Sequence, residues 1–170
     1  PFLSLWIART LYFPYITGRN FGFRILVEIA LAFWLGLMFL DKNYRPKASW
    51  LLWALVIFTG IVGLADLFGV DPYHSFWSRY ERMEGYLMIL HLLAYFLILT
   101  SVFRAKKDWL ILFNIFMIVG ILVGSYGVLQ IFGFKEAIQG GDVRIDGTIG
   151  NPTYLAAYLL LIVALTGILF

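Results

Sequence analysis

The sequence contains no cysteine, so a disulfide framework, a zinc–thiolate site and a cysteine nucleophile are all excluded. Charged residues are also scarce. They make up 14% of the 170 residues, whereas an ordinary soluble domain carries about a quarter. So few charges cannot cover a surface that faces water. An integral membrane protein is therefore the first interpretation of this composition.

Hydrophobic residues make up 62% of the chain, and its mean hydropathy is +0.86. A membrane span needs roughly 20 apolar residues. The candidate spans are residues 1–16, 23–40, 50–69, 85–103, 109–133 and 152–170. Backbone polar groups must be paired internally in hydrocarbon, so these runs should be helices. The predicted fold class is all-α, a polytopic transmembrane helical bundle of about six spans.

The two ends of the sequence have the character of cut ends. The chain begins at Pro1 without a methionine and stops at Phe170 inside an apolar run. We therefore expect the first and last spans to be truncated, and residues 1–170 to be the N-terminal transmembrane part of a longer membrane domain.

Basic residues lie in the connectors between the apolar runs. "DKNYRPKAS" (residues 41–49) and "RAKKD" (residues 104–108) are separated by two spans, so they should share one side of the membrane. The positive-inside rule makes that side cytoplasmic. Residues 70–84 and 134–151 should then lie outside the cytoplasmic membrane. The pI near 9.2 reflects these basic loops, and no nucleic-acid partner is expected.

The connector "YHSFWSRYERMEG" (residues 73–85) holds the densest polar cluster. Ser78 and Glu81 fit the capping box S-x-x-E just before the fourth span. Glu81 and Glu84 would also lie in a first helical turn, where the helix dipole favours negative charge. Capping does not explain Arg79 and Arg82. Three alternatives remain open for these arginines: pairing with the glutamates, contact with lipid phosphates, or binding of an anionic substrate.

A second connector, "GGDVRIDGTIGNPTYLAAY", precedes the sixth span. Asn151 can cap that helix, and Pro152 suits the first helical position. The free amides of the helix start would favour an anion. Arg144 is the basic residue nearest to them, and a guanidinium grips phosphate with two parallel hydrogen bonds. The alternative is a flexible loop followed by a well-capped helix.

Some ionisable residues fall within or at the ends of the spans. Such residues usually face the interior of a helix bundle. We expect His91 to form a hydrogen bond between helices, and Arg24 to pair with Glu28 one turn away. Asp66 lies near the outer end of the third span, within reach of the outer connectors.

Three stretches carry a family resemblance. "SFWSRYERMEGYLMILHLLAYF" and "RIDGTIGNPTYLAAYLLL" together resemble the bacterial O-antigen ligase and polymerase family of multi-pass membrane glycosyltransferases. "FPYITGRNFGFRILVEIAL" is similar to the stretch that precedes them in that family. The resemblance covers nearly the whole chain in the same order.

The resemblance implies an enzyme of lipopolysaccharide biosynthesis in the cell envelope. Such proteins transfer a glycan from an undecaprenyl-diphosphate carrier to an acceptor on the outer side of the cytoplasmic membrane, without a metal or cofactor. Arg144 matches the arginine that holds the diphosphate. The expected catalytic histidine lies beyond Phe170, so the fragment alone should be inactive. The candidate substrate-binding residues are Arg144, Arg79, Arg82, Glu81, Glu84 and Asn151.

Several alternatives stay open. The acceptor can be a lipid, a glycan or a protein, so O-antigen polymerase and protein O-oligosaccharyltransferase belong to the same hypothesis as O-antigen ligase. A transporter of a lipid-linked glycan is a separate hypothesis, as is an assembly subunit without catalysis. Membrane lipids are expected partners in every case. Charges clustered at one membrane face favour surface chemistry over transport, because transporters place charged groups near the midplane.

Overall fold

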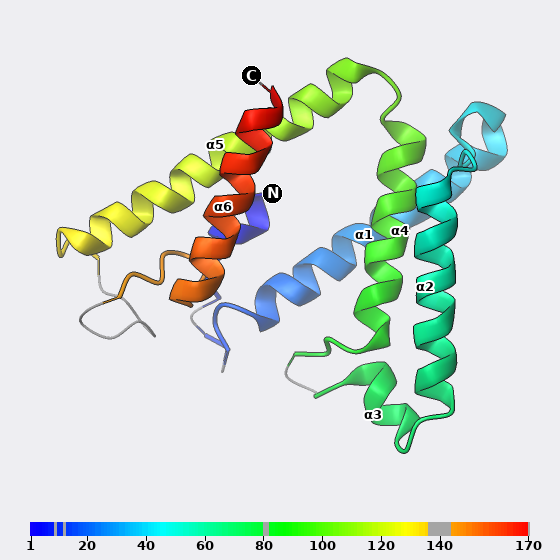
Figure 1. The fold of residues 1–170 in the computed structure, drawn as a ribbon, viewed down its shortest axis with the longest axis horizontal. Coiled ribbons are helices and arrows are strands. Elements are labelled where there is room, and N and C mark those ends of the chain that lie inside the picture. The colour runs from blue at the N-terminus through cyan, green and yellow to red at the C-terminus, as the bar shows by residue number, and fades with distance from the viewer. Residues whose placement is uncertain (9, 12, 80–81, 136–143, 170) are drawn as a thin grey trace. The chain divides into compact units, whose positions relative to one another are not determined.

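The computed structural model describes residues 1–8, 10–11, 13–79, 82–135 and 144–169. The described residues are 74% helical and include no strand, in agreement with the all-α prediction (Figure 1). The elements in chain order are η1 (Phe2–Leu5), α1 (Thr17–Leu40), η2 (Lys42–Tyr44), α2 (Trp50–Leu67), α3 (Pro72–Trp77), α4 (Tyr86–Val102), α5 (Lys106–Ile131) and α6 (Pro152–Leu169).

The chain divides into two compact units. The first unit combines Pro1–Arg19 with Ala105–Phe170, and the second unit is Asn20–Arg104. The first therefore holds η1, the start of α1, α5 and α6. The second holds the remainder of α1 with η2, α2, α3 and α4.

The second unit is built around α4, which packs against both α1 and α2. Val27, Trp34 and Ile98 form its buried core. The start of α2 has a local cause. The Ser49 hydroxyl accepts a hydrogen bond from the Leu52 amide at the start of α2, 3.1 Å away, which is the usual role of serine at an N-cap.

Arg104, the last residue of the second unit, lies beside the connector between α1 and α2. The Arg104 guanidinium lies over the Tyr44 ring, 5.0 Å from its centroid. The Tyr44 carbonyl also accepts a hydrogen bond from the Trp34 indole at 3.1 Å. Arg104 and Tyr44 therefore lie at the same end of this unit, and the prediction that residues 41–49 and 104–108 share one side of a membrane stays a prediction.

In the first unit, α5 packs along α6. The core consists of Val119, Val123 and Leu155, all nearly inaccessible to solvent. Gly120 allows the two helices to approach closely, because a Cβ at this position would lie 2.8 Å from an Ile162 methyl group. Small residues at such crossings are typical of helix pairs in membranes.

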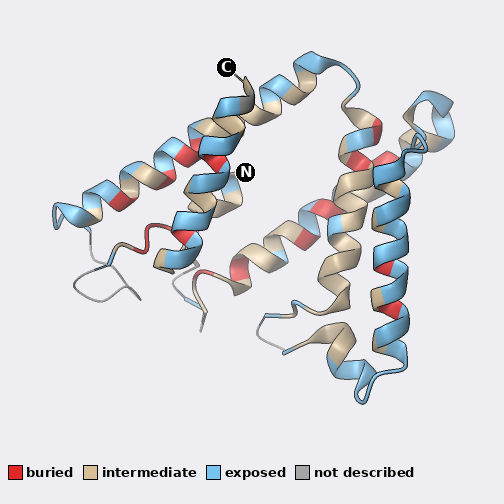
Figure 2. Ribbon diagram, in the orientation of Figure 1, coloured by how far each residue is buried: buried red, intermediate tan, exposed pale blue. Residues whose placement is uncertain are grey.

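Three helices, α1, α2 and α5, are long and apolar enough to cross a membrane. Figure 2 shows α2 exposed along most of its length. Its exposed side chains are large and apolar, and include Trp50 (93% exposed) and Leu67 (69% exposed). Contiguous apolar surface of this kind is rare on proteins that face water, whereas hydrocarbon would cover it without penalty.

The prediction of six spans is therefore met in part. α4 has 17 residues, which rise only about 26 Å at roughly 1.5 Å per residue. A hydrocarbon core is about 30 Å thick, so α4 is slightly short for a perpendicular crossing. The described part of α6 is also among the shorter apolar helices.

The prediction that residues 1–16 form a membrane-spanning helix is wrong. Its described residues form the 3-10 helix Phe2–Leu5 and then turns and irregular backbone. Pro14 lies close before the start of α1 at Thr17, and proline disfavours helical backbone in the residue that precedes it. A count of apolar residues misses this interruption.

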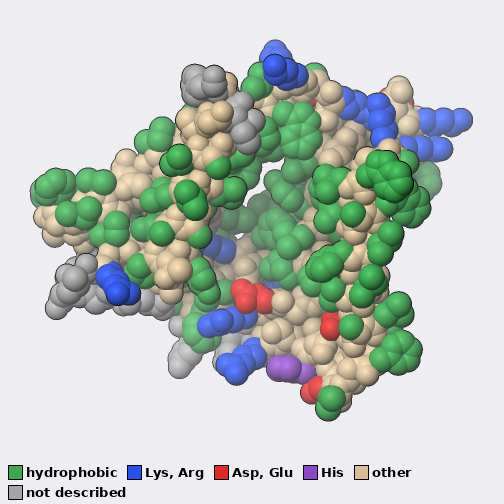
Figure 3. All heavy atoms as spheres, in the orientation of Figure 1, with side chains coloured by type: hydrophobic (Ala, Val, Ile, Leu, Met, Phe, Trp, Pro, Cys, Tyr) green, Lys and Arg blue, Asp and Glu red, His purple; other side chains and the backbone are tan. Residues whose placement is uncertain are grey.

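Charged side chains of the second unit gather beyond the ends of its long helices. Figure 3 shows hydrophobic side chains along α2, basic ones at the connector before it, and acidic, basic and histidine side chains around α3. The exposed charged or histidine residues of these two groups include Lys42, Arg45, Lys47, Asp71, His74, Arg79, Arg82 and Glu84.

Candidate functional site

The α5–α6 connector, defined here as residues 144–151, is held by a side chain from the end of α5. The Gln130 amide nitrogen donates a hydrogen bond to the Asp146 carboxylate at 2.7 Å. The Gln130 carbonyl oxygen accepts one from the Gly147 backbone N–H at 2.8 Å. Asp146 is fully buried. A buried carboxylate is tolerated when donors satisfy it, so this clamp fixes the connector to α5.

Two further anchors come from the N-terminal part of the first unit. The Thr148 hydroxyl donates to the Ser4 carbonyl at 2.8 Å. Arg19 donates from Nε to the Trp6 carbonyl at 2.8 Å, and from Nη2 to the Thr148 carbonyl. Thr148 is only 4% exposed. The middle of the connector is therefore tied to three separate segments of the chain.

Gly150 closes the turn of this connector. Its N–H donates to the Asp146 carbonyl at 2.9 Å, and its φ is +80°, a conformation that L-residues rarely adopt. A Cβ at Gly150 would overlap the ring of Tyr15, which is itself 5% exposed. The backbone thus passes directly against a buried aromatic ring, and only glycine fits.

The start of α6 is capped as predicted. The Asn151 side-chain oxygen accepts hydrogen bonds from the Thr153 N–H at 2.9 Å and the Tyr154 N–H at 3.3 Å. Pro152, the first helical residue, has no N–H to satisfy. The anion site expected at this helix start stays a prediction, and the cap already occupies the Thr153 and Tyr154 amides. The helix dipole remains.

Arg144 stands at the beginning of this connector. Its side chain is exposed and makes no hydrogen bond to the described residues. It lies two residues before the buried Asp146, so the backbone just beyond it is fixed while its guanidinium is accessible. With the amides of α6 occupied, Arg144 is the main group in this connector for an anion.

The α3–α4 connector, residues 78–85, belongs to the second unit. The capping-box prediction for Ser78 is wrong. Ser78 ends α3, its N–H donating to the His74 carbonyl at 2.6 Å with a φ of 58°. α4 begins only at Tyr86, after Gly85 as its N-cap. Asp71 and Pro72 start an unpredicted short helix, α3, of which Ser78 is the C-cap, and α4 begins eight residues further along the chain.

Asn20, from α1, holds the charged part of this connector. Its side-chain nitrogen donates to the Glu84 carboxylate at 3.0 Å and to the Arg82 carbonyl at 3.2 Å. The side chains of Arg79, Arg82 and Glu84 are exposed. Glu81, the fourth charged residue predicted here, lies outside the described residues.

The ionisable residues within the helices of the second unit pair differently from the prediction. The Glu28 carboxylate lies 3.1 Å from His91 Nε2, which joins α1 to α4. The hydrogen bond between helices predicted for His91 is confirmed. Glu28 contacts His91 directly, whereas it attracts the Arg24 guanidinium electrostatically without forming a direct ion pair with it. Arg24 donates from Nε to the Asn20 carbonyl at 3.3 Å and lies over the Phe21 ring.

Three residues that hold the connectors were not singled out from the sequence: Gln130, Arg19 and Asn20. Each is a polar residue near the end of a long apolar helix. That position was a usable signal, because a side chain there can reach the backbone of an adjoining connector. Their partners could not be named without the fold.

Arg144 and Asn151 thus share one unit, and Arg79, Arg82 and Glu84 share the other. Within the described residues, no group of three or more His, Cys, Asp and Glu side chains is placed to hold a metal ion. Comparison of the chain with protein-family models, curated proteins and solved structures finds no match.

Proposed function

We propose that the chain is part of a membrane glycosyltransferase that moves a glycan from an undecaprenyl-diphosphate carrier to an acceptor. The resemblance of the two connectors to O-antigen ligases motivates the proposal. One structural observation supports it most strongly: Arg144 is exposed, while the backbone that follows it is fixed by Gln130 and Arg19. An accessible guanidinium next to fixed backbone suits a ligand whose negative charge increases during the reaction.

The chemistry requires no metal to balance. The bond between the anomeric carbon and the diphosphate oxygen breaks, and the acceptor oxygen forms a new bond to that carbon. The acceptor proton passes to a base, and the diphosphate leaves with its electron pair. Arg144 would bind the departing diphosphate through two parallel hydrogen bonds, which strengthen as negative charge develops.

The other candidate residues take supporting roles in this proposal. Arg79 and Arg82 would add positive charge for the diphosphate or the glycan. Glu84, held by Asn20, would orient that connector, and Glu81 stays a candidate on the resemblance alone. Asn151 would position α6 rather than touch the substrate, because its oxygen caps the helix.

The nature of the acceptor separates three forms of the proposal. A lipid acceptor defines an O-antigen ligase, a growing glycan defines a polymerase, and a protein hydroxyl defines an O-oligosaccharyltransferase. We favour the ligase-like form on the resemblance of the two connectors.

A lipid-linked glycan transporter is the second candidate function, and one observation favours it. Glu28 lies at the middle of α1 and contacts His91 of α4. Ionisable pairs within membrane helices often mark ion or substrate pathways. Against it, the long helices α1, α2 and α5 are unbroken, whereas transporters commonly have discontinuous helices at their binding sites.

The proposed location is the cytoplasmic membrane, with both connectors on its outer side. Residues 1–170 contain no cysteine, so a single cysteine introduced among them is the one thiol that this part of the protein offers to a labelling reagent. In intact cells, an impermeant thiol reagent should label the Tyr73→Cys variant, whose position is 76% exposed. It should not label Asn43→Cys until the membrane is opened. The reverse pattern would invert the orientation.

The function itself is tested with the full-length protein in liposomes that contain an undecaprenyl-diphosphate glycan. Lipid, glycan and protein acceptors are supplied separately. A glycosyltransferase should produce a new covalent product with one acceptor class and release undecaprenyl diphosphate. A transporter would instead move the carrier between leaflets without releasing diphosphate.

A further inference from the structure

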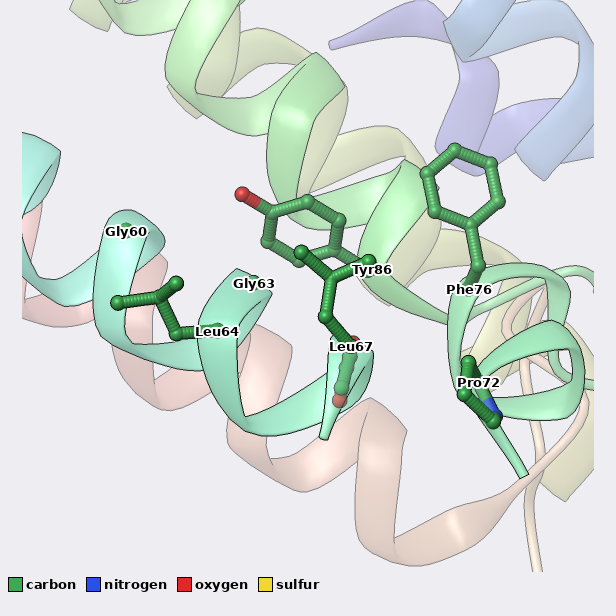
Figure 4. A pocket seen from close by; sticks show the side chains of 8 residues that line it. Gly60, Gly63, Leu64, Leu67, Pro72, Phe76 and Tyr86 are labelled. Carbon is green, nitrogen blue, oxygen red and sulfur yellow. The ribbon is translucent and has the colours of Figure 1, made fainter. Parts of the chain in front are cut away.

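A pocket of about 280 Å³ lies within the second unit where α2, α3 and α4 come together (Figure 4). α2 supplies one wall through Leu64 and Leu67, and α3 supplies another through Pro72 and Phe76. Tyr86 of α4 closes the inner side. Its walls are almost entirely apolar.

Two glycines on α2 keep this space open. Tyr86 crosses α2 at Gly63, where a Cβ would lie 2.5 Å from the phenol oxygen, and the Tyr86 hydroxyl donates to the Thr59 carbonyl at 3.1 Å. Gly60 has nothing within 4 Å of a Cβ placed on it. The pocket therefore has a fixed floor at Tyr86 and an open side at Gly60.

Among the described residues, Asp66 is the one charged residue that lines the pocket. It is half-buried, and its carboxylate makes no hydrogen bond or ion pair with the described residues. It lies in the last turn of α2, which contains no basic residue. The C-terminal end of a helix carries partial negative charge. The carboxylate and the helix end therefore act together, and both favour a cation.

We propose that this pocket binds one phosphatidylethanolamine molecule, with its ammonium group at Asp66 and a segment of one acyl chain along the apolar walls. The apolar walls match a hydrocarbon segment, and Asp66 matches a primary ammonium that donates hydrogen bonds to it. The volume lies just below the roughly 300–1,000 Å³ of pockets for drug-sized ligands. It therefore suits a segment of one chain and a small headgroup, not a complete lipid. Asp66 ends a membrane-length helix, where lipid headgroups are expected.

The proposal does not depend on glycan transfer, and its test is a binding measurement. The full chain is purified in mild detergent and titrated with phosphatidylethanolamine, phosphatidylcholine or phosphatidylglycerol of identical acyl chains. Native mass spectrometry then counts the bound lipid. We expect one phosphatidylethanolamine to bind roughly tenfold more tightly than phosphatidylglycerol. Phosphatidylcholine should be intermediate, because its quaternary ammonium cannot donate a hydrogen bond.

Variants separate the headgroup contact from the chain contact. Asp66→Asn should abolish the preference for phosphatidylethanolamine, and Asp66→Glu should retain it. Gly60→Leu should fill the pocket and remove the bound lipid altogether. The matched control is Gly36→Leu, because Gly36 of α1 is exposed, has the same free space around it and does not line the pocket.

Any of three results would overturn the proposal. The first is equal binding of the three lipids by the wild-type chain. The second is an unchanged preference for phosphatidylethanolamine in Asp66→Asn, and the third is equal lipid binding by Gly60→Leu and Gly36→Leu. Because Gly60→Leu leaves Asp66 intact, a folding defect in the Asp66→Asn variant would not hide the answer.

Discussion

The two polar connectors, residues 144–151 and 78–85, both combine arginine with carboxylate side chains, but they are anchored very differently. In residues 144–151, Gln130, Ser4 and Arg19 anchor three consecutive residues that are almost fully buried. In residues 78–85, Asn20 donates hydrogen bonds to the Arg82 carbonyl and the Glu84 carboxylate, and both bonds lie at exposed positions. An exposed arginine is positioned most firmly where the backbone next to it is buried and anchored. By that criterion, Arg144 is the stronger candidate for binding a substrate anion.

Removal of Arg144 should have the largest effect. In the full-length protein, Arg144→Ala should lower the rate of glycan transfer by about a hundredfold or more, as expected for the loss of one fixed charge-stabilising group. Arg144→Lys should recover only part, because a point charge replaces a planar fork. Transfer is measured in membranes with protein amounts matched by immunoblot.

Arg79→Ala is the matched control in the other connector and should lower the rate much less. If Arg144→Ala transferred glycan at the wild-type rate, the comparison between the connectors would be invalid. Arg79 and Arg82 would then become the leading ligands for the diphosphate.

Gly150 tests whether the anchored connector depends on its contact with Tyr15. Gly150→Ala should destabilise the protein by about 3 kcal/mol, because it adds an overpacking penalty to left-handed backbone strain. Gly133→Ala is the control, since Gly133 has a similar φ of +74° but no atom within 4 Å of a Cβ. It should lose only the strain, about 1 kcal/mol. Thermal unfolding in detergent measures both, and equal losses would exclude the Tyr15 contact as the cause.

The variants Gln130→Ala and Asn20→Ala allow the two anchors to be compared directly. Gln130→Ala leaves the buried Asp146 without one donor, which should destabilise the fold by about 2 kcal/mol. Asn20→Ala removes bonds at exposed positions, and about 0.5 kcal/mol is expected. Hydrogen–deuterium exchange provides a local readout, since the Gly147 amide should exchange faster only in the Gln130 variant. Similar exchange in the two variants would contradict a difference in anchoring.

Much of the fold follows from apolar runs. The lengths of α2, α5 and α6 match the predicted runs closely, because an uninterrupted apolar segment has few alternatives to a helix in a membrane. The failures lie where short-range signals compete. Asp71 with Pro72 starts a short helix and so displaces Ser78 from its predicted capping role.

The candidate site was less accessible to prediction. The cap at Asn151 depends only on neighbouring residues, and the sequence was sufficient to predict it. The clamp from Gln130 to Asp146 joins residues that are 16 positions apart. Glu28 directly contacts His91, which is 63 positions away, rather than Arg24, which is one turn along the same helix. Contacts between separate helices depend on how those helices pack, which a single sequence does not reveal.

The central claim is that Arg144 binds the diphosphate, and the most direct test measures carrier binding without catalysis. The affinity of the full-length protein for undecaprenyl diphosphate is compared in wild type, Arg144→Ala and Arg79→Ala. We predict that Arg144→Ala weakens binding by roughly tenfold or more, as for the loss of a bidentate charged contact, while Arg79→Ala stays within a few-fold of wild type. Wild-type affinity in Arg144→Ala, together with weakened binding in Arg79→Ala, would contradict the account and move the diphosphate to residues 78–85.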